Sequence, residues 1–428
     1  MCQVRCAMRY VVVSAGLSPS QIEVELKKIG ARGISVKRLT RQVFCELDER
    51  QVRALERIPG LRVRPVREIR AAQITAPQAV VPQQLQEVTV WQVFSDLRNL
   101  FAPPLSGRGL TIAVLDSGIR KTHRSLRGKV VYEANFTDSD TLTDVFGHGT
   151  QVAFVAAGCD PEGETGVAPG AKVMNIKVLN DEGVGTEESI ISGIEEVCEL
   201  VEKGMREGIH PTEDLFPNII NLSLGAEDDG DPENPVRVAC REAVARGVDV
   251  VAAVGNQGPK MTTVMLPACD PQVVGVGALE SGRIAVWEKS SRGPTLEGKI
   301  KPDFVLWGTG LRMASEDSDD GYITKTGTSF SCPMISGLTG LLWEAGRRSY
   351  GDYYLFRWGP AMELAPYYCV KPAEAPRKKD NNYGYGLPAM GTLLGQVTRV
   401  RTPEQQMMET FPVIMMLGLV GRMMGGMA

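Results

Sequence analysis

Histidine is scarce in this chain. Only His123, His148 and His210 occur among 428 residues, so a site that needs an imidazole has three candidates. Aromatic residues make up 6% of the chain, the net charge is −4, and no long basic run occurs. This composition argues against nucleic acid as a partner.

Paired cysteine motifs are also missing. The nine cysteines are an odd number, and no two of them form a CxxC pair. The pattern argues against a disulfide framework and against a zinc site of the usual spacing. Arg9 stands where the apolar core of a signal peptide would lie, and no apolar run is long enough to cross a membrane. The sequence therefore predicts an intracellular protein with no signal peptide and no transmembrane segment.

Charge is unevenly distributed along the chain. Residues 1–75 hold 15 Lys/Arg and 7 Asp/Glu, a net charge of +8, and the remainder holds 32 and 44, a net charge of −12. A basic unit beside an acidic body indicates electrostatic docking. The alternative is two domains whose charges are unrelated.

Residues 1–70 read as a small domain with the order β-α-β-β-α-β. Ser18, Pro19 and Gln21 form a helix start, and Gly30 ends that helix. Asp48 is placed to cap a second helix. The last strand is predicted over 61–69. This order is typical of a ferredoxin-like unit.

Three further segments follow. Residues 71–87 are rich in Ala, Pro and Gln and are expected to form an exposed linker. Residues 88–395 alternate apolar, β-branched runs with helical segments, which predicts an α/β sandwich with a mostly parallel central sheet. Residues 396–428 form a Met-rich tail. That tail is either a binding surface, also for self-association, or a segment that packs on the body.

The stretch TGTSFSCPMISG places Ser329 between a Gly-Thr pair and the start of a predicted helix. A serine hydroxyl is weakly nucleophilic near neutral pH, so it needs a base, and the base needs an orienting group. His148, in FGHGT, is the favoured base because the flanking glycines let a substrate backbone approach. His123 and His210 lie in polar loops and are expected at the surface.

Asp116 ends the apolar strand LTIAVLD, at the carboxyl edge of the sheet where α/β proteins place their sites. It is a candidate orienting group, although such an Asp is also typical of a cap or a turn. Asn256 follows another strand, in AAVGNQGP, and could donate to an oxyanion. The backbone N–H of Ser329, at a helix start, is a second donor.

These motifs together resemble the subtilisin-like serine proteases, the peptidase S8 family. DSGI, GHGT and GTSFSCP are similar to its catalytic signatures, in the family order Asp, His, Ser. GNQGP is similar to its oxyanion segment, and YGYGLPAM to its closing motif. The resemblance covers residues 88–395 and implies a three-layer subtilisin-like fold. It implies that Ser329 is the nucleophile, His148 the base and Asp116 the group that orients His148.

The resemblance also implies a substrate cleft. One edge to which a substrate strand adds would be Ser223, Leu224 and Gly225, and the facing rim would be Gly183, Val184 and Gly185. Small residues are expected around the side chain before the scissile bond and imply a roomy, apolar pocket. They are Gly225, Ala253, Val254 and Gly255.

The N-terminal unit resembles the family's inhibitory propeptide, with a maturation cut expected within 71–87. No cofactor is required for the chemistry. Structural Ca²⁺ is common in the family, and the acidic stretches 227–234 and 315–321 are candidate sites, with solvated loops as the alternative.

Three positions depart from the family pattern. Gln151 and Phe154 follow His148, and Phe154 needs space near the base. Cys332 follows the nucleophile and is either a small buried residue or a second nucleophile.

The sequence thus predicts a serine endopeptidase that acts on polypeptides and is made as a self-inhibited, self-processing zymogen. One alternative is a subtilisin-fold binding or assembly protein that uses its Met-rich tail. Another is an enzyme whose main substrate is itself.

Overall fold

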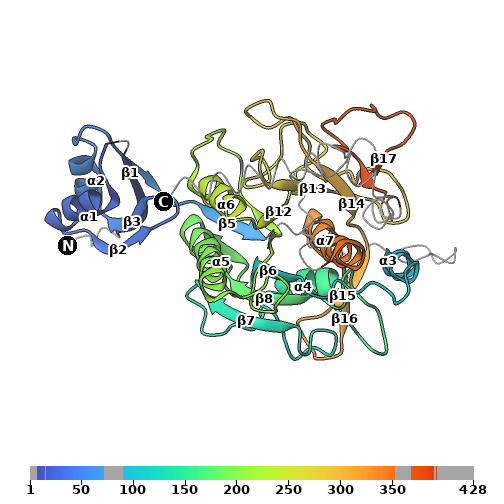
Figure 1. Cartoon of the computed structure of the whole chain (residues 1–428). Coiled ribbons are helices and arrows are strands. Elements are labelled where there is room, and N and C mark those ends of the chain that lie inside the picture. Colours follow the sequence, from blue (N-terminus) through green and yellow to red (C-terminus); the bar gives the residue numbers. More distant parts are fainter. Residues whose placement is uncertain (1–6, 15, 72–89, 352–367, 390–391, 393–428) are drawn as a thin grey trace.

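The computed structural model shows a small N-terminal unit joined to a larger body (Figure 1). It describes residues 7–14, 16–71, 90–351, 368–389 and 392. The predicted Met-rich tail and all of the predicted linker except Ala71 lie outside these residues. Among the described helices, none is both long and apolar enough to cross a bilayer.

The N-terminal unit is a four-stranded antiparallel sheet with two helices. Its strand order is β2-β3-β1-β4, and the chain order matches the predicted β-α-β-β-α-β pattern. Ser18 and Gln21 form the predicted capping box, and Asp48 caps the second helix. The ferredoxin-like prediction is therefore confirmed. The elements are β1 (Met8–Ser14), α1 (Pro19–Lys28), β2 (Arg32–Lys37), β3 (Gln42–Leu47), α2 (Glu49–Leu55) and β4 (Leu61–Pro65).

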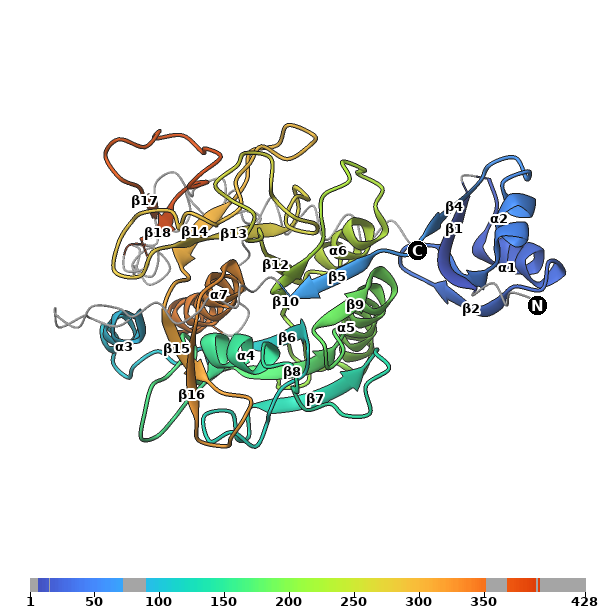
Figure 2. The ribbon, with the colours of Figure 1, turned by 180° about the vertical axis from the view of Figure 1, so that it is seen from behind.

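The single strand predicted over 61–69 is wrong, because two strands occupy this region. β4 ends at Pro65, and β5 (Glu68–Ala71) leaves the unit. β5 lies between β11 (Leu224–Gly225) and β9 (Val184–Thr186) of the body and is antiparallel to both. Figures 1 and 2 show this strand reaching from the small unit across the body. The end of the N-terminal unit thus belongs to a sheet of the body.

A seven-stranded sheet forms the centre of the body. Its order is β14-β13-β12-β10-β6-β8-β7, and all six neighbouring pairs are parallel. Most of these strands are buried along their whole length, as their apolar runs predict. They are β6 (Thr111–Asp116), β7 (Val130–Asn135), β8 (Lys172–Lys177), β10 (Ile219–Leu222), β12 (Asp249–Ala253), β13 (Val274–Leu279) and β14 (Phe304–Trp307).

Helices cover both faces of this sheet (Figures 1 and 2). α4 (Gly149–Ala157) and α7 (Thr328–Tyr350) pack on one face, and α5 (Glu187–Glu207) and α6 (Pro235–Ala245) on the other. The predicted three-layer α/β architecture is therefore confirmed. Since parallel strands end at a common edge, the end of β6 and the beginnings of α4 and α7 meet there.

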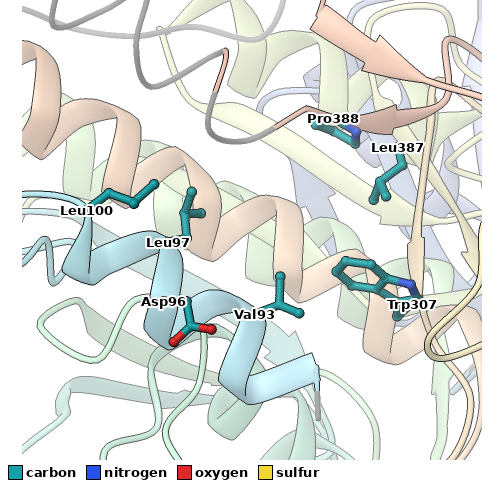
Figure 3. A pocket seen from close by; sticks show the side chains of 7 residues that line it. All are labelled: Val93, Asp96, Leu97, Leu100, Trp307, Leu387 and Pro388. Atoms are coloured by element: carbon teal, nitrogen blue, oxygen red, sulfur yellow. The ribbon is translucent and has the colours of Figure 1, made fainter. Parts of the chain in front are cut away.

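Smaller elements complete the body. β15 (Leu311–Ala314) and β16 (Tyr322–Lys325) form a hairpin before α7, and β17 (Cys369–Val370) pairs with β18 (Leu387–Pro388). α3 (Val90–Asn99) lies beside a hollow that β14 and β18 also line, as Figure 3 shows. No predicted site residue lines this hollow. Its lining residues are Val93, Asp96, Leu97, Leu100, Trp307, Leu387 and Pro388.

Candidate active site

A hydrogen bond joins Asp116, the last residue of β6, to His148. The Nδ1 atom of His148 lies 2.7 Å from Oδ1 of Asp116, and both side chains are almost fully buried. The Nε2 atom of His148 is also buried and has no hydrogen-bond partner among the described residues. An imidazole held through Nδ1 by a carboxylate presents Nε2 as a base. The structure thus brings together two of the residues predicted for the site.

The loop before α4 is fixed by a second carboxylate, which the sequence did not single out. Asp144 accepts hydrogen bonds from the backbone N–H groups of Gly147 and Thr150 and from the hydroxyl of Ser117, each at 2.8 Å. A Cβ on Gly149 would lie 3.1 Å from Cβ of Asp116, so glycine allows the helix to approach this strand. These contacts set the position of His148, the N-cap residue of α4.

Ser329 lies in the first turn of α7, as predicted, and is buried. Its hydroxyl donates to the carbonyl of Ser223 at 3.1 Å. The ring of the next residue, Phe330, lies 5.7 Å from the imidazole of His148, measured between ring centroids. The helix start that carries Ser329 is therefore adjacent to the base.

Asn256 lies beside the same helix start. Its Oδ1 atom accepts hydrogen bonds from the N–H and the hydroxyl of Thr328, at 3.0 and 2.9 Å. With the oxygen held in this way, the amide nitrogen is the atom that can donate to a substrate. Sequence reasoning overlooked Thr328, although it stands directly before Ser329 in the motif.

The two predicted edges of the substrate cleft lie on either side of β5. Ala71 pairs with Leu224 and Arg70 with Gly225 on one side, and Arg70 pairs with Val184 on the other. The N–H of Ala71 donates to the carbonyl of Gly183 at 3.3 Å. Ile69 pairs with Gly185, which completes the predicted rim. A segment of the chain itself thus occupies the groove expected to take a substrate strand.

Ion pairs join the N-terminal unit to the start of α5. Arg64 lies 2.7 Å from the fully buried carboxylate of Glu187, and Arg9 donates two hydrogen bonds of 2.7 Å to Glu188. Arg67 pairs with Asp229 at 2.7 Å. Each pair has its cation on the N-terminal unit and its anion on the body. The contact therefore has the charge complementarity that the sequence indicated.

The prediction of a roomy pocket beside Gly225 and Gly255 is wrong, because the side chain of Met265 lies against both glycines. A Cβ on Gly255 would lie 2.6 Å from Cγ of Met265, and a Cβ on Gly225 would lie 3.2 Å from its Cε. Ala253 and Val254 are fully buried, and their role as pocket walls stays a prediction. The segment around Met265 gave no motif from which this contact could have been predicted.

The other two histidines lie in different surroundings. The expectation that His123 is a surface residue is wrong, because its side chain is fully buried. Its Nδ1 lies 2.7 Å from the hydroxyl of Ser125 and its Nε2 lies 2.8 Å from the carbonyl of Gly321. Burial lowers the pKa of His123. His210 is partly exposed and contacts Thr212.

The three departures from the family pattern have structural explanations. Phe154 packs edge-on against Trp91 and Tyr322, which accounts for its ring. Gln151 donates to the carboxylate of Glu316 at 2.7 Å. Cys332 is fully buried, and burial raises the pKa of its thiol, which favours a packing role over a nucleophilic one.

The two acidic stretches proposed for calcium use several of their carboxylates in protein contacts. Asp229 pairs with Arg67, and Asp319 pairs with Arg120 at 2.8 Å. Within the described parts of the chain, no three His, Cys, Asp or Glu side chains converge as a metal site requires. Calcium binding stays a prediction.

Comparisons with known proteins identify the family of this chain. The model of the Subtilase family matches residues 107–386. AprX, a serine protease of Bacillus subtilis (strain 168), is 34% identical over 265 residues, which are 56% of this chain and 58% of AprX. A subtilisin of Bacillus sp. (strain TA39) is 31% identical over 316 residues, 70% of this chain and 72% of that protein. An intracellular serine protease of Paenibacillus polymyxa is 30% identical over 286 residues, 63% of this chain and 79% of that protein.

Solved structures give the same result. Sphericase superposes on this chain with a TM-score of 0.56 and 26% sequence identity. The match covers 72% of this chain and 99% of the sphericase chain. A psychrophilic protease, S41, superposes with a TM-score of 0.57 at 26% identity and covers 71% of this chain and 98% of its own. The predicted subtilisin-like fold is thereby confirmed. The chain belongs to the subtilase family and is a subtilisin-like serine protease.

Proposed function

We propose that Ser329, His148 and Asp116 form a catalytic triad that hydrolyses peptide bonds. The observation that carries this proposal is the buried 2.7 Å hydrogen bond between Asp116 and His148, next to the helix start that holds Ser329. His148 takes the hydroxyl proton through Nε2 as the oxygen of Ser329 attacks the substrate carbonyl. It then gives that proton to the leaving amine, and water releases the acyl group by the same route. Asp116 keeps the imidazole in the required tautomer and orientation.

We assign the stabilisation of the oxyanion to Asn256. The two hydrogen bonds from Thr328 to Oδ1 orient the side chain so that its amide nitrogen can face the substrate carbonyl oxygen. The backbone N–H of Ser329 is the second donor, because it belongs to the first turn of α7. Donors fixed before the reaction stabilise the developing charge without the cost of reorganisation.

Substrates add as a strand between two edges, Ser223–Gly225 and Gly183–Gly185. The support for this assignment is β5, whose backbone already pairs with both edges. Main-chain hydrogen bonds of this kind accept many sequences, and the side-chain pockets provide selectivity. The substrate class is therefore extended polypeptide.

The N-terminal unit acts as an inhibitory propeptide, so that the chain is a zymogen that processes itself. Its last strand fills the groove, and its ion pairs to Glu187 and Glu188 hold it on the body. Ala71, the last residue of β5, pairs with Leu224, the neighbour of Ser223, and the carbonyl of Ser223 contacts Ser329. The described strand thus ends close to the proposed nucleophile, and we propose that the cut follows directly, after Ala72. Residues 72–87, the rest of the predicted maturation segment, lie outside the described residues.

Replacing Ser329 with Ala tests this function. The purified wild-type chain should yield a fragment that begins at Gln73, detected by mass spectrometry, and Ser329→Ala should stay full-length. A fluorophosphonate probe should label Ser329 in the processed protein. Trimming of purified Ser329→Ala would contradict self-processing. A folded, processed protein that takes no label would favour the alternative of a binding or assembly protein.

Two further predictions from the sequence stay proposals. An intracellular location is supported by similarity to two proteins whose names call them intracellular, one from Paenibacillus polymyxa and one from Bacillus subtilis. Detection of the protein outside intact cells would contradict it. Self-association through the Met-rich tail is tested by deleting residues 403–428. The deletion should lower the number of chains per particle in solution and leave peptide cleavage unchanged.

A further inference from the structure

We infer that Met265 limits the residue before the scissile bond to a small side chain, such as Ala, Ser or Gly. This inference rests on the proposed function, because it concerns the pocket next to Ser329. The walls of that pocket are the backbone at Gly225 and at Gly255, and the thioether of Met265 lies between them.

The position of the pocket follows from contacts around the nucleophile. The N–H of Gly255 lies 3.3 Å from the hydroxyl of Thr328, the residue before Ser329. Gly225 is two residues from Ser223, whose carbonyl accepts the hydrogen bond of Ser329. A substrate strand that runs along Gly225 toward Ser329 therefore places its next outward side chain between these two glycines.

Main-chain hydrogen bonds hold Met265 in this position. Its N–H donates to the carbonyl of Val254 at 2.9 Å, on one wall. The next residue, Leu266, exchanges two hydrogen bonds with Ala226, at 2.9 and 3.2 Å, on the other wall. The segment thus bridges both walls, and the backbone of Met265 cannot withdraw without breaking these bonds.

The side chain of Met265 then fills the space that the glycines leave open. A Cβ on Gly255 would lie 2.6 Å from its Cγ, and a Cβ on Gly225 would lie 3.1 Å from its Cβ and 3.2 Å from its Cε. The carbonyl of Leu266 would lie 2.8 Å from that same Cβ on Gly225. A substrate Phe or Leu must displace the thioether, whereas Ala meets no such obstacle. Because Met is flexible, we expect strong selectivity and not complete exclusion.

The test uses the self-processed protein and two peptide p-nitroanilide substrates that differ only in their last residue, Ala or Phe. In the wild type, kcat/KM for the Ala substrate should be at least about 10-fold higher than for the Phe substrate. This is the discrimination expected from a hydrophobic pocket that is too small for one of two side chains. Met265→Gly should raise kcat/KM for the Phe substrate by about 10- to 100-fold, so that the preference for the Ala substrate is lost or reversed. Met265→Ala should shift the ratio in the same direction and replaces the glycine variant if that variant does not fold.

Met261 gives a matched control, since it is an exposed methionine four residues away. Met261→Gly should leave the ratio of the two substrates at the wild-type value. Equal cleavage of both substrates by wild type, or an unchanged ratio in both Met265 variants, overturns the inference alone. Failure of the fluorophosphonate probe to label Ser329 overturns the proposed function and this inference with it.

Discussion

Ser223 and Ser329 are joined by two hydrogen bonds that run in opposite directions. The hydroxyl of Ser329 donates to the carbonyl of Ser223 at 3.1 Å, and the hydroxyl of Ser223 donates to the carbonyl of Ser329 at 2.8 Å. These two bonds fix the position of Ser223, which directly precedes β11, relative to the first turn of α7. A strand bound along that edge meets the proposed nucleophile at a fixed position, and such positioning is a large part of the catalytic effect.

Asp116→Asn should leave the fold intact and lower kcat by about 10⁴-fold, because an amide at this position favours the wrong tautomer of His148. Steady-state kinetics on a peptide substrate measures the loss, and circular dichroism checks the fold. Asp140→Asn is a suitable control, since Asp140 is exposed. Comparable losses in both variants would mean that Asp116 has no special role.

Asn256→Ala should lower kcat by about 10²- to 10³-fold with little change in KM, because one donor to the oxyanion is lost. Thr328→Ser keeps both hydrogen bonds to Oδ1 and should retain near wild-type kcat. If Asn256→Ala raised KM and left kcat unchanged, the side chain would bind substrate equally in the ground and transition states, and the oxyanion role would be wrong.

Local chemistry explains what could be predicted from the sequence. The end of an apolar strand places Asp116, and a glycine-flanked helix start places His148, so short motifs are enough to identify both residues. The helix caps at Ser18 and Asp48 are equally local, because each needs only residues within three positions.

Contacts between distant segments explain what could not be predicted. The strand pattern over 61–69 does not show that the chain divides into two strands there. The second strand pairs with β9 and β11, which lie more than a hundred residues further along the sequence. The polar surroundings of His123 in the sequence favoured exposure, but the carbonyl of Gly321 reaches it from 198 residues away. Met265 is likewise held beside Gly225 and Gly255 by contacts between separate segments, because its own N–H bonds to Val254 and the next residue, Leu266, bonds to Ala226.

Arg64→Ala should weaken the hold of the N-terminal unit on the processed body. Loss of this guanidinium leaves the buried carboxylate of Glu187 with fewer partners, and truncating one member of such a pair costs about 2–5 kcal/mol. The dissociation constant of the processed complex should rise accordingly, by at least about 30-fold. Arg62→Ala, at an exposed position of the same strand, is the control. Equal constants for the two variants would show that this ion pair does not hold the unit.

Cys332→Ala should keep kcat within about twofold of wild type, because burial raises the pKa of this thiol and the thiolate is the reactive form. Iodoacetamide should not modify Cys332 in the folded protein. The labelling uses Ser329→Ala, so that self-digestion is not expected during the experiment. Residual peptidase activity of Ser329→Ala that disappears when Cys332 is also replaced would show the thiol to be a second nucleophile.

His123 should make the stability of the protein fall as pH drops below about 6.5. Its Nδ1 accepts hydrogen bonds from the hydroxyl and the N–H of Ser125, and its Nε2 donates to Gly321, an arrangement that requires a neutral ring. Burial lowers its pKa in the folded state, so the unfolded chain binds a proton more readily. The stabilisation is therefore complete above the unfolded pKa, near 6.5, and is lost as pH falls toward the folded value.

The measurement is the free energy of unfolding of Ser329→Ala at several pH values, since we expect that this variant does not digest itself. One proton contributes a slope of up to about 1.4 kcal/mol per pH unit. Adding His123→Gln should lower stability at pH 7.5 and flatten the slope below about pH 6.5. The carboxyl groups with lowered pKa, Asp160, Asp303 and Asp319, act at lower pH, whereas burial raises the pKa of Glu164 and of Glu195. The change of slope on replacing His123 therefore separates its contribution from theirs. If His123→Gln does not change the slope, the pH dependence of stability comes from other groups.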